Sequence, residues 1–191
     1  MSSGFDLVRP LPGAAFGGRL VATIAGGARG LIEAAEREPG ALPRALADCR
    51  GLMLIPGMAA MAEAPELLLR LSRIFGPEVE NYRENLTPLN MVHPTVAEIF
   101  MVSNTPPANR PPPALPSPPL VYALMTHITQ PRFVYVHEWT KGDLAIWDNR
   151  CLVRAATWFD ADKLGRAMWR TTVSGNPGPA YAGEAKSWIA A

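Results

Sequence analysis

The hydrophobic positions between residues 41 and 75 alternate between a helical and a strand-like spacing. Leu42 and Leu46 lie four residues apart within Ala41–Arg50, which predicts a helix. Gly51–Gly57 follows as a short apolar run that ends in Pro-Gly, a pattern that favours a buried strand. Ala64–Phe75 returns to the helical spacing and is followed by Gly-Pro, so we expect a second helix to end there.

The last third of the chain combines strand patterns with all five tryptophans, which we expect to lie in the core. Leu120–Thr129 predicts a helix, and Phe133–Trp139 alternates like a strand with Tyr135 and His137 on one face. Further strands are expected at Val96–Ser103, Asp143–Trp147, Cys151–Thr157 and Ala167–Val173, with a hairpin turn at Lys141-Gly142. Short strands at this spacing indicate an α+β fold with a barrel or jelly-roll sheet.

A proline-rich segment, Pro106–Pro119, separates these two parts of the chain. Proline lacks the backbone N–H and fixes φ, so this segment can join neither a helix nor a sheet ladder. We expect an extended connector, and the PxxP spacing leaves an SH3- or WW-type ligand as an alternative.

Composition narrows the class of protein without identifying it. A chain of 191 residues with 48% hydrophobic and 18% charged residues is expected to fold as one globular domain, residues 1–191. The net charge of +1 gives no reason to expect nucleic acid or an anionic membrane as a partner. Cys49 and Cys151 match no CxxC spacing and no apolar run is long enough to span a membrane, so we expect a cytoplasmic protein.

Four short motifs occur in order near the C-terminal end of the chain. They are His137-Glu138-Trp139, Gly142-Asp143-Leu144, Trp147-Asp148-Asn149-Arg150 (WDNR) and Arg166-Ala167-Met168-Trp169-Arg170-Thr171. Together they resemble the C-terminal core of the TauD/TfdA family of Fe(II)/2-oxoglutarate dioxygenases. The resemblance implies a double-stranded β-helix (jelly-roll, cupin-like) with flanking helices, of which this chain would hold a part.

The same resemblance implies the cofactors and the residues of a site. The family uses Fe(II) and 2-oxoglutarate to hydroxylate small organic acids. By position, Arg170 would bind the 2-oxoglutarate carboxylate with help from Arg166, and arginine suits that task because its guanidinium binds a carboxylate bidentately. Tyr82 and Asn85 lie where family members often contact the substrate.

The residues that should hold the iron are missing from this sequence. The family's first two ligands form a His-x-Asp or His-x-Glu pair, but His93, His127 and His137 are followed two positions later by Thr95, Thr129 and Trp139. The third ligand, a histidine seven residues after the tryptophan of WDNR, is replaced by Arg154. Arginine stays protonated and offers no lone pair to a metal. We expect the family's central section to be deleted at the proline-rich connector, and we expect no catalytic or metal-binding residues in this copy.

Several functions therefore stay open at the level of sequence. Arg154 either replaces the charge of the metal, gripping a dicarboxylate together with Arg170, or reflects drift in a disused site. The chain is expected to be an inactive dioxygenase relative. The alternatives are a non-catalytic protein that binds a small carboxylate or another protein, and a remnant that self-associates through exposed sheet edges. His137 and Glu138 are expected to be structural, because neighbouring strand residues face opposite ways.

Overall fold

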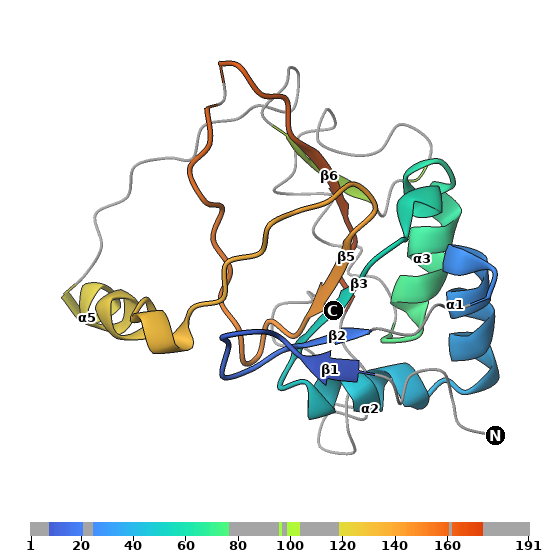
Figure 1. Ribbon diagram of the computed structural model, residues 1–191, viewed down its shortest axis with the longest axis horizontal. Coiled ribbons are helices and arrows are strands. Elements are labelled where there is room, and N and C mark those ends of the chain that lie inside the picture. Colours follow the sequence, from blue (N-terminus) through green and yellow to red (C-terminus); the bar gives the residue numbers. More distant parts are fainter. Residues whose placement is uncertain are drawn as a thin grey trace, which may run out of the picture.

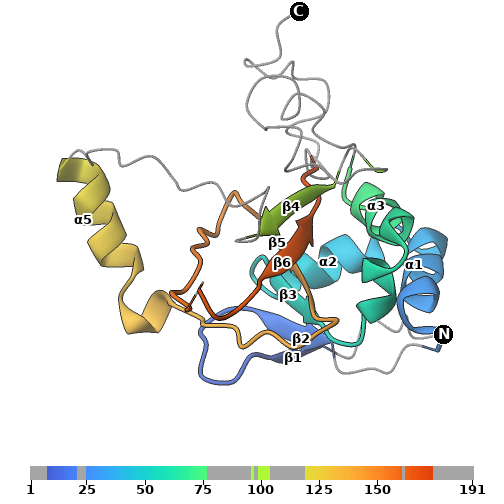
Figure 2. The ribbon, with the colours of Figure 1, turned by 90° about the horizontal axis from the view of Figure 1, so that it is seen from above.

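The computed structural model describes residues 8–20, 25–76, 96, 99–103, 119–160 and 162–173, and its architecture there is mixed α+β. Its helices are α1 (Gly27–Arg37), α2 (Ala41–Asp48), α3 (Pro65–Arg73) and α5 (Pro119–Ile128), with 3-10 turns η1 (Ala59–Ala62) and η3 (Pro131–Phe133). Its strands are β1 (Val8–Pro10), β2 (Gly18–Leu20), β3 (Leu52–Ile55), β4 (Phe100–Ser103), β5 (Leu144–Trp147) and β6 (Ala167–Arg170). Helices α1, α2 and α3 gather at one end of the molecule and α5 lies at the opposite end (Figures 1 and 2).

The larger sheet combines three strands from the first third of the chain with one strand from the last third. Its four strands follow the order β1-β2-β3-β5, with β1–β2 antiparallel, β2–β3 parallel and β3–β5 antiparallel. In the last pairing Leu52 lies opposite Trp147 and Ile55 opposite Leu144. β4 and β6 form a separate antiparallel pair in which Phe100 lies opposite Arg170. The segment that carries the family-like motifs therefore builds on a strand from the first third of the chain.

The hydrophobic core lies between the helices and one face of this sheet. Leu31, Ile32, Leu42 and Met53 are fully buried, and Leu67 nearly so. These side chains come from α1, α2, β3 and α3, and Leu144, Ile146 and Trp169 pack against their cluster from the C-terminal strands. Burial of this apolar surface is the main contribution that stabilises the helical end.

Four predicted elements are confirmed, and their predicted ends agree with the structure to within two residues. The predicted helices Ala41–Arg50, Ala64–Phe75 and Leu120–Thr129 are α2, α3 and α5, and the predicted strand Gly51–Gly57 is β3. Gly76, at φ 134°, follows α3 as its pattern predicted. Strands β5 and β6 also lie within the segments predicted for them.

Two strand predictions near the C-terminal end are wrong. Residues 134–140 and 152–157 are not in strands. Tyr135 and His137 are half-buried and Val134 and Val136 exposed, as the alternation indicated, but Phe133, predicted on the same face as Tyr135 and His137, is exposed. The predicted hairpin is wrong as well, because β5 follows the turn at Gly142 (φ 92°) but pairs with β3. Periodicity reports which face of a segment is buried, whereas a strand also needs a neighbouring ladder.

Some elements were missed and some predictions lie outside the described residues. α1 has buried positions at Ala28, Leu31, Ile32 and Ala35, a helical spacing that was readable in the sequence. Strands β1 and β2 have three residues each, too few to show alternation. Tyr82, Asn85, His93 and the proline-rich segment before Pro119 lie outside the described residues, and β4 covers only the end of the strand predicted at Val96–Ser103.

None of the helices in the described part of the chain has the length and apolar character needed to cross a membrane. Both cysteines are free thiols, with Cys49 buried and Cys151 exposed.

Candidate functional site

The WDNR motif forms a tight turn at the end of β5. Arg150 donates from Nε and Nη2 to the Asp148 carboxylate at 2.6–3.0 Å, and its backbone N–H donates to Asp148 Oδ1 at 2.9 Å. Asn149 Oδ1 accepts from the indole N–H of Trp147 at 2.8 Å. These polar residues therefore satisfy turn and backbone hydrogen bonds, as their position at the end of a strand indicated.

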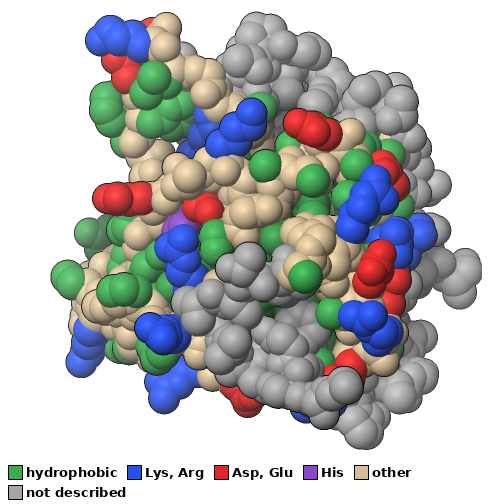
Figure 3. Space-filling view, turned by 45° about the vertical axis from the view of Figure 1, so that its right-hand side comes forward, with side chains coloured by type: hydrophobic (Ala, Val, Ile, Leu, Met, Phe, Trp, Pro, Cys, Tyr) green, Lys and Arg blue, Asp and Glu red, His purple; other side chains and the backbone are tan. Residues whose placement is uncertain are grey.

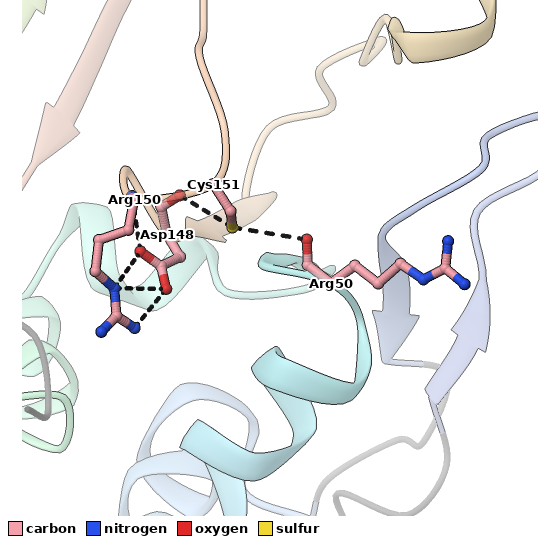
Figure 4. Close-up of polar contacts among 4 residues, drawn as sticks. All are labelled: Arg50, Asp148, Arg150 and Cys151. Atoms are coloured by element: carbon pink, nitrogen blue, oxygen red, sulfur yellow. Dashed lines mark hydrogen bonds and ion pairs between the residues drawn. The ribbon is translucent and has the colours of Figure 1, made fainter. Parts of the chain in front are cut away.

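This turn docks on the end of α2 (Figure 4). The backbone N–H of Asp148 donates to the carbonyl of Gly51 at 2.8 Å. The Cys151 thiol lies 3.5 Å from the carbonyl oxygen of Asp148 and 4.0 Å from that of Arg50. The contacts link residues a hundred positions apart in the sequence, so the motif fastens the C-terminal segment to the helical end.

The ion pair in the turn changes the acidity of its carboxyl group. The hydrogen bonds from the Arg150 side chain hold the pKa of the Asp148 carboxyl below its ordinary value, and partial burial opposes them. The Asp148 side chain is 22% exposed and that of Arg150 is 60% exposed. The pair is therefore partly screened by solvent and its net contribution to stability is modest.

Arg154 occupies the position that the resemblance assigns to the distal histidine. It lies on the exposed segment after the turn, and its guanidinium carbon is 4.9 Å from the centroid of the Trp147 ring. A cation over an aromatic face at this distance is held by the ring quadrupole. A protonated guanidinium therefore stands against the tryptophan of WDNR, where the family would have a metal ligand.

Two of the predicted anion-binding arginines share one face of β6. Arg166, Met168 and Arg170 are spaced by two residues, which places them on the same side of an extended segment. The Nη2 of Arg166 lies 3.9 Å from Met168 Sδ, and its guanidinium carbon is 5.5 Å from the centroid of Phe159. Trp169 on the opposite side packs against the core. Arg166 and Arg170 are half-buried, whereas Arg154 is exposed. Arg154 lies in the segment after β5, which is a strand of the larger sheet, whereas β6 pairs with β4 in the separate two-stranded sheet.

Three side chains in and just after the segment before β5 are linked by hydrogen bonds. His137 Nε2 lies 3.1 Å from Asp143 Oδ2, and His137 Nδ1 lies 3.2 Å from the Tyr135 hydroxyl. An imidazole with its proton on Nε2 satisfies both contacts, because it donates to the carboxylate and accepts from the phenol. The same Asp143 oxygen accepts the Thr140 backbone N–H at 2.9 Å. Sequence reasoning assigned His137 a structural role but did not find these partners, which lie two and six residues away.

Burial also acts on the phenol of this series. Desolvation raises the pKa of Tyr135 above its ordinary value, and the nearby positive charge of Arg19 on β2 opposes that rise. The His137 and Asp143 side chains are 14% and 12% exposed. Because Tyr135, His137 and Asp143 are hydrogen-bonded to one another, we interpret them as a structural support for the turn at Gly142.

The described part of the chain contains a cavity but no cluster of metal ligands. The residues that the structure describes contain no group of three or more His, Cys, Asp or Glu side chains placed to hold a metal ion. A cavity of about 460 Å³ lies between β1, β2 and α2, with Glu38, Arg44, Asp48 and Cys49 among its lining residues. Arg44 and Glu38 form an ion pair of 2.7 Å there. This cavity lies away from the arginine face of β6.

The sequence from the end of α3 to just beyond β6 decides the relationship to known proteins. Residues 76–172, just over half of the chain, match the family described as "Taurine catabolism dioxygenase TauD, TfdA family". The chain belongs to the TauD/TfdA family. The WDNR turn, Arg154 and the arginine face of β6 all lie within the matched segment, so the resemblance inferred from the motifs is confirmed.

Curated relatives of this TauD/TfdA member match it over short stretches. The (S)-phenoxypropionate/alpha-ketoglutarate-dioxygenase of Sphingobium herbicidovorans is 40% identical over 58 residues, 30% of this chain and 20% of that protein. The alpha-ketoglutarate-dependent 2,4-dichlorophenoxyacetate dioxygenase of a Burkholderia species is 43% identical over 56 residues, 29% of this chain and 18% of that protein. The aligned part thus spans about a fifth of these relatives' length. No solved structure gives a significant match to the chain.

Proposed function

We propose that this chain is a non-catalytic member of the TauD/TfdA family. The observation that carries the proposal is the guanidinium of Arg154 against Trp147, at the position of the family's distal histidine ligand. A guanidinium has no lone pair for a metal, and its charge repels a cation. The sequence also contains no His-x-Asp or His-x-Glu pair. These residues do not fit Fe(II), so no reaction step is assigned to it here.

A partial double-stranded β-helix is the fold that we propose for the family segment. Its support is the antiparallel pairing of β3 with β5 and of β4 with β6. We also propose that residues 1–191 form one domain, since β3 from the helical end pairs with β5.

The test is release of succinate from 2-oxoglutarate by the purified chain with Fe(II), ascorbate and a phenoxy acid. Phenoxy acids are chosen because the names of two relatives include them. The Sphingobium relative serves as the positive control. We expect no iron-dependent succinate from the parent chain, nor from Arg154→His, because one restored histidine does not complete a first coordination shell. Iron-dependent turnover by the parent chain would overturn the proposal.

The arginine face of β6 supports a second proposal, that the chain binds a small carboxylate without turning it over. Arg166 and Arg170 flank Met168 on one face and are both half-buried, which strengthens their attraction for an anion relative to fully exposed groups. A carboxylate of the 2-oxoglutarate type is the anion that we propose, because a guanidinium binds a carboxylate bidentately.

Thermal unfolding with added ligand tests this second proposal. A ligand that binds only the native state raises the melting temperature, and we expect a rise of about 2 °C or more with millimolar 2-oxoglutarate. Arg170→Gln is expected to abolish the rise. Arg132→Gln, which removes an exposed arginine beside Phe133, is the matched control and should retain it. An unchanged melting temperature of the parent chain would exclude the site.

A further inference from the structure

Helix α5 presents apolar side chains to solvent on all sides. None of its residues is buried, and Leu120, Tyr122 and Leu124 are 70%, 71% and 54% exposed. Figures 1 and 2 show it standing away from the other helices, and Figure 3 shows hydrophobic side chains at the surface along the left-hand side of that view. A helix that is apolar all round is normally buried.

Two threonine hydroxyls at the C-terminal end of α5 are satisfied by backbone carbonyls of the helix. The Thr126 hydroxyl donates to the carbonyl of Tyr122 at 2.9 Å, and the Thr129 hydroxyl just beyond it donates to that of Met125 at 2.7 Å. From Pro119 to Pro131 the sequence contains no Asp, Glu, Lys or Arg. An occupant of this surface therefore meets no Asp, Glu, Lys or Arg side chain of the helix, which keeps the desolvation cost of burying the surface low.

The apolar surface continues beyond the helix. We define the α5 surface by five apolar residues of the helix and four of the segment after it, all more than two fifths exposed: Leu120, Val121, Tyr122, Leu124, Met125, Phe133, Val134, Val136 and Trp139. Side chains of this size and exposure offer on the order of 800 Å² per copy over all sides of the helix and the segment after it, and a partner helix covers the part of this area that faces it.

We propose that a second copy of this chain covers the α5 surface, forming a symmetric dimer in which the two α5 helices pack against each other. An isologous contact brings the same patch from both copies together, so an uncharged apolar patch is complementary to itself. The net charge of +1 leaves little long-range repulsion between two copies. An anionic membrane or a nucleic acid would favour Lys or Arg along the helix, and the sequence there has neither.

Analytical ultracentrifugation of the full chain between about 1 and 100 μM tests the dimer. We expect a monomer–dimer equilibrium. Leu124→Glu is expected to weaken it at least about tenfold, because a charge would be buried against the partner helix. Leu124 is exposed within one copy, so the variant should keep the helical circular dichroism of the parent chain.

Ala47→Glu is the matched control, since it adds the same charge at an exposed position of another helix, α2. It is expected to dimerise like the parent chain. Three results would each overturn the proposal. They are a monomer at every concentration, a dimer that Leu124→Glu leaves intact, and a polydisperse aggregate in place of a closed dimer.

Discussion

Arg50 adopts the left-handed backbone conformation (φ 54°) between the end of α2 and Gly51 (φ 85°). Non-glycine residues reach this region at a cost of about 1 kcal/mol, and neighbouring contacts must offset it. Here the guanidinium donates to the carbonyl of Ala15 at 3.0 Å, and the Arg50 carbonyl faces the Cys151 thiol. A strained turn of the helical end is thus held by the WDNR turn of the family segment.

Substitution of Gly51 measures how closely these two turns approach. A Cβ at Gly51 would lie 2.5 Å from Cys151 Sγ, whereas a Cβ at Gly57 meets nothing within 4 Å. Both glycines have positive φ, so alanine at either adds similar backbone strain. We expect Gly51→Ala to lower the free energy of unfolding by about 1–3 kcal/mol more than Gly57→Ala, measured by urea denaturation.

A double variant completes this comparison. Cys151→Ala removes the sulfur atom, so Gly51→Ala should cost less in that background than in the parent chain. Equal costs for Gly51→Ala and Gly57→Ala in the parent chain would show that the two turns are farther apart.

The carboxyl of Asp148 gives the turn a predictable pH dependence. Its pKa is lowered in the folded state, so its contribution to stability is present above the unfolded pKa of about 3.9 and is lost as pH falls through the folded value. Asp148→Asn should therefore lower the free energy of unfolding by about 1 kcal/mol at pH 7, with the difference shrinking below about pH 4. The exposed Asp162→Asn should change it by less than about 0.5 kcal/mol. A difference for Asp148→Asn that stays constant from pH 7 to pH 2.5 would contradict this assignment.

Among the elements, those whose apolar spacing is supported by burial were the predictable ones. α2 and α3 pack leucines at four-residue spacings into the core, and β3 is an apolar run with three of its four residues buried. The segments predicted as strands before and after β5 are not in the sheet, and Trp158, expected in the core, is 89% exposed. The alternation in these segments is that of a strand, but whether a segment pairs with a neighbouring strand depends on the rest of the fold. Local sequence does not encode that pairing.

Two alanine substitutions compare the packing of the core with that of the C-terminal segment. Met53 on β3 is fully buried, whereas Leu164 is 58% exposed. We expect Met53→Ala to lower the free energy of unfolding by about 2–5 kcal/mol, because it removes packed atoms and leaves a cavity. Leu164→Ala should change it by less than about 0.5 kcal/mol in the same denaturant titration. Similar losses for both variants would mean that the segment before β6 packs as tightly as the core.

At the scale of the whole molecule, family membership was readable from sequence and most of the site geometry was not. WDNR, Arg166 and Arg170 identified the lineage from sequence. The contact of Arg154 with Trp147, the docking of Asp148 on Gly51 and the partners of His137 depend on turns and long-range pairing. Spacing alone could not supply them.

The family fold and the absent ligands lead to opposite expectations about metal binding. TauD/TfdA relatives are named for 2-oxoglutarate-dependent dioxygenation, whereas this chain has Arg154 at the position that the resemblance assigns to the distal histidine, and no His-x-Asp or His-x-Glu pair. The whole-molecule prediction is that Fe(II) does not bind at a defined site, since a site without ligands offers no compensation for dehydrating the cation.

Anaerobic titration of the purified chain with Fe(II), followed by metal analysis after gel filtration, tests the central claim most directly. The proposed non-catalytic role predicts far less than one iron per chain, with or without 2-oxoglutarate, and the same low value for Arg154→His. One iron retained per parent chain would contradict it.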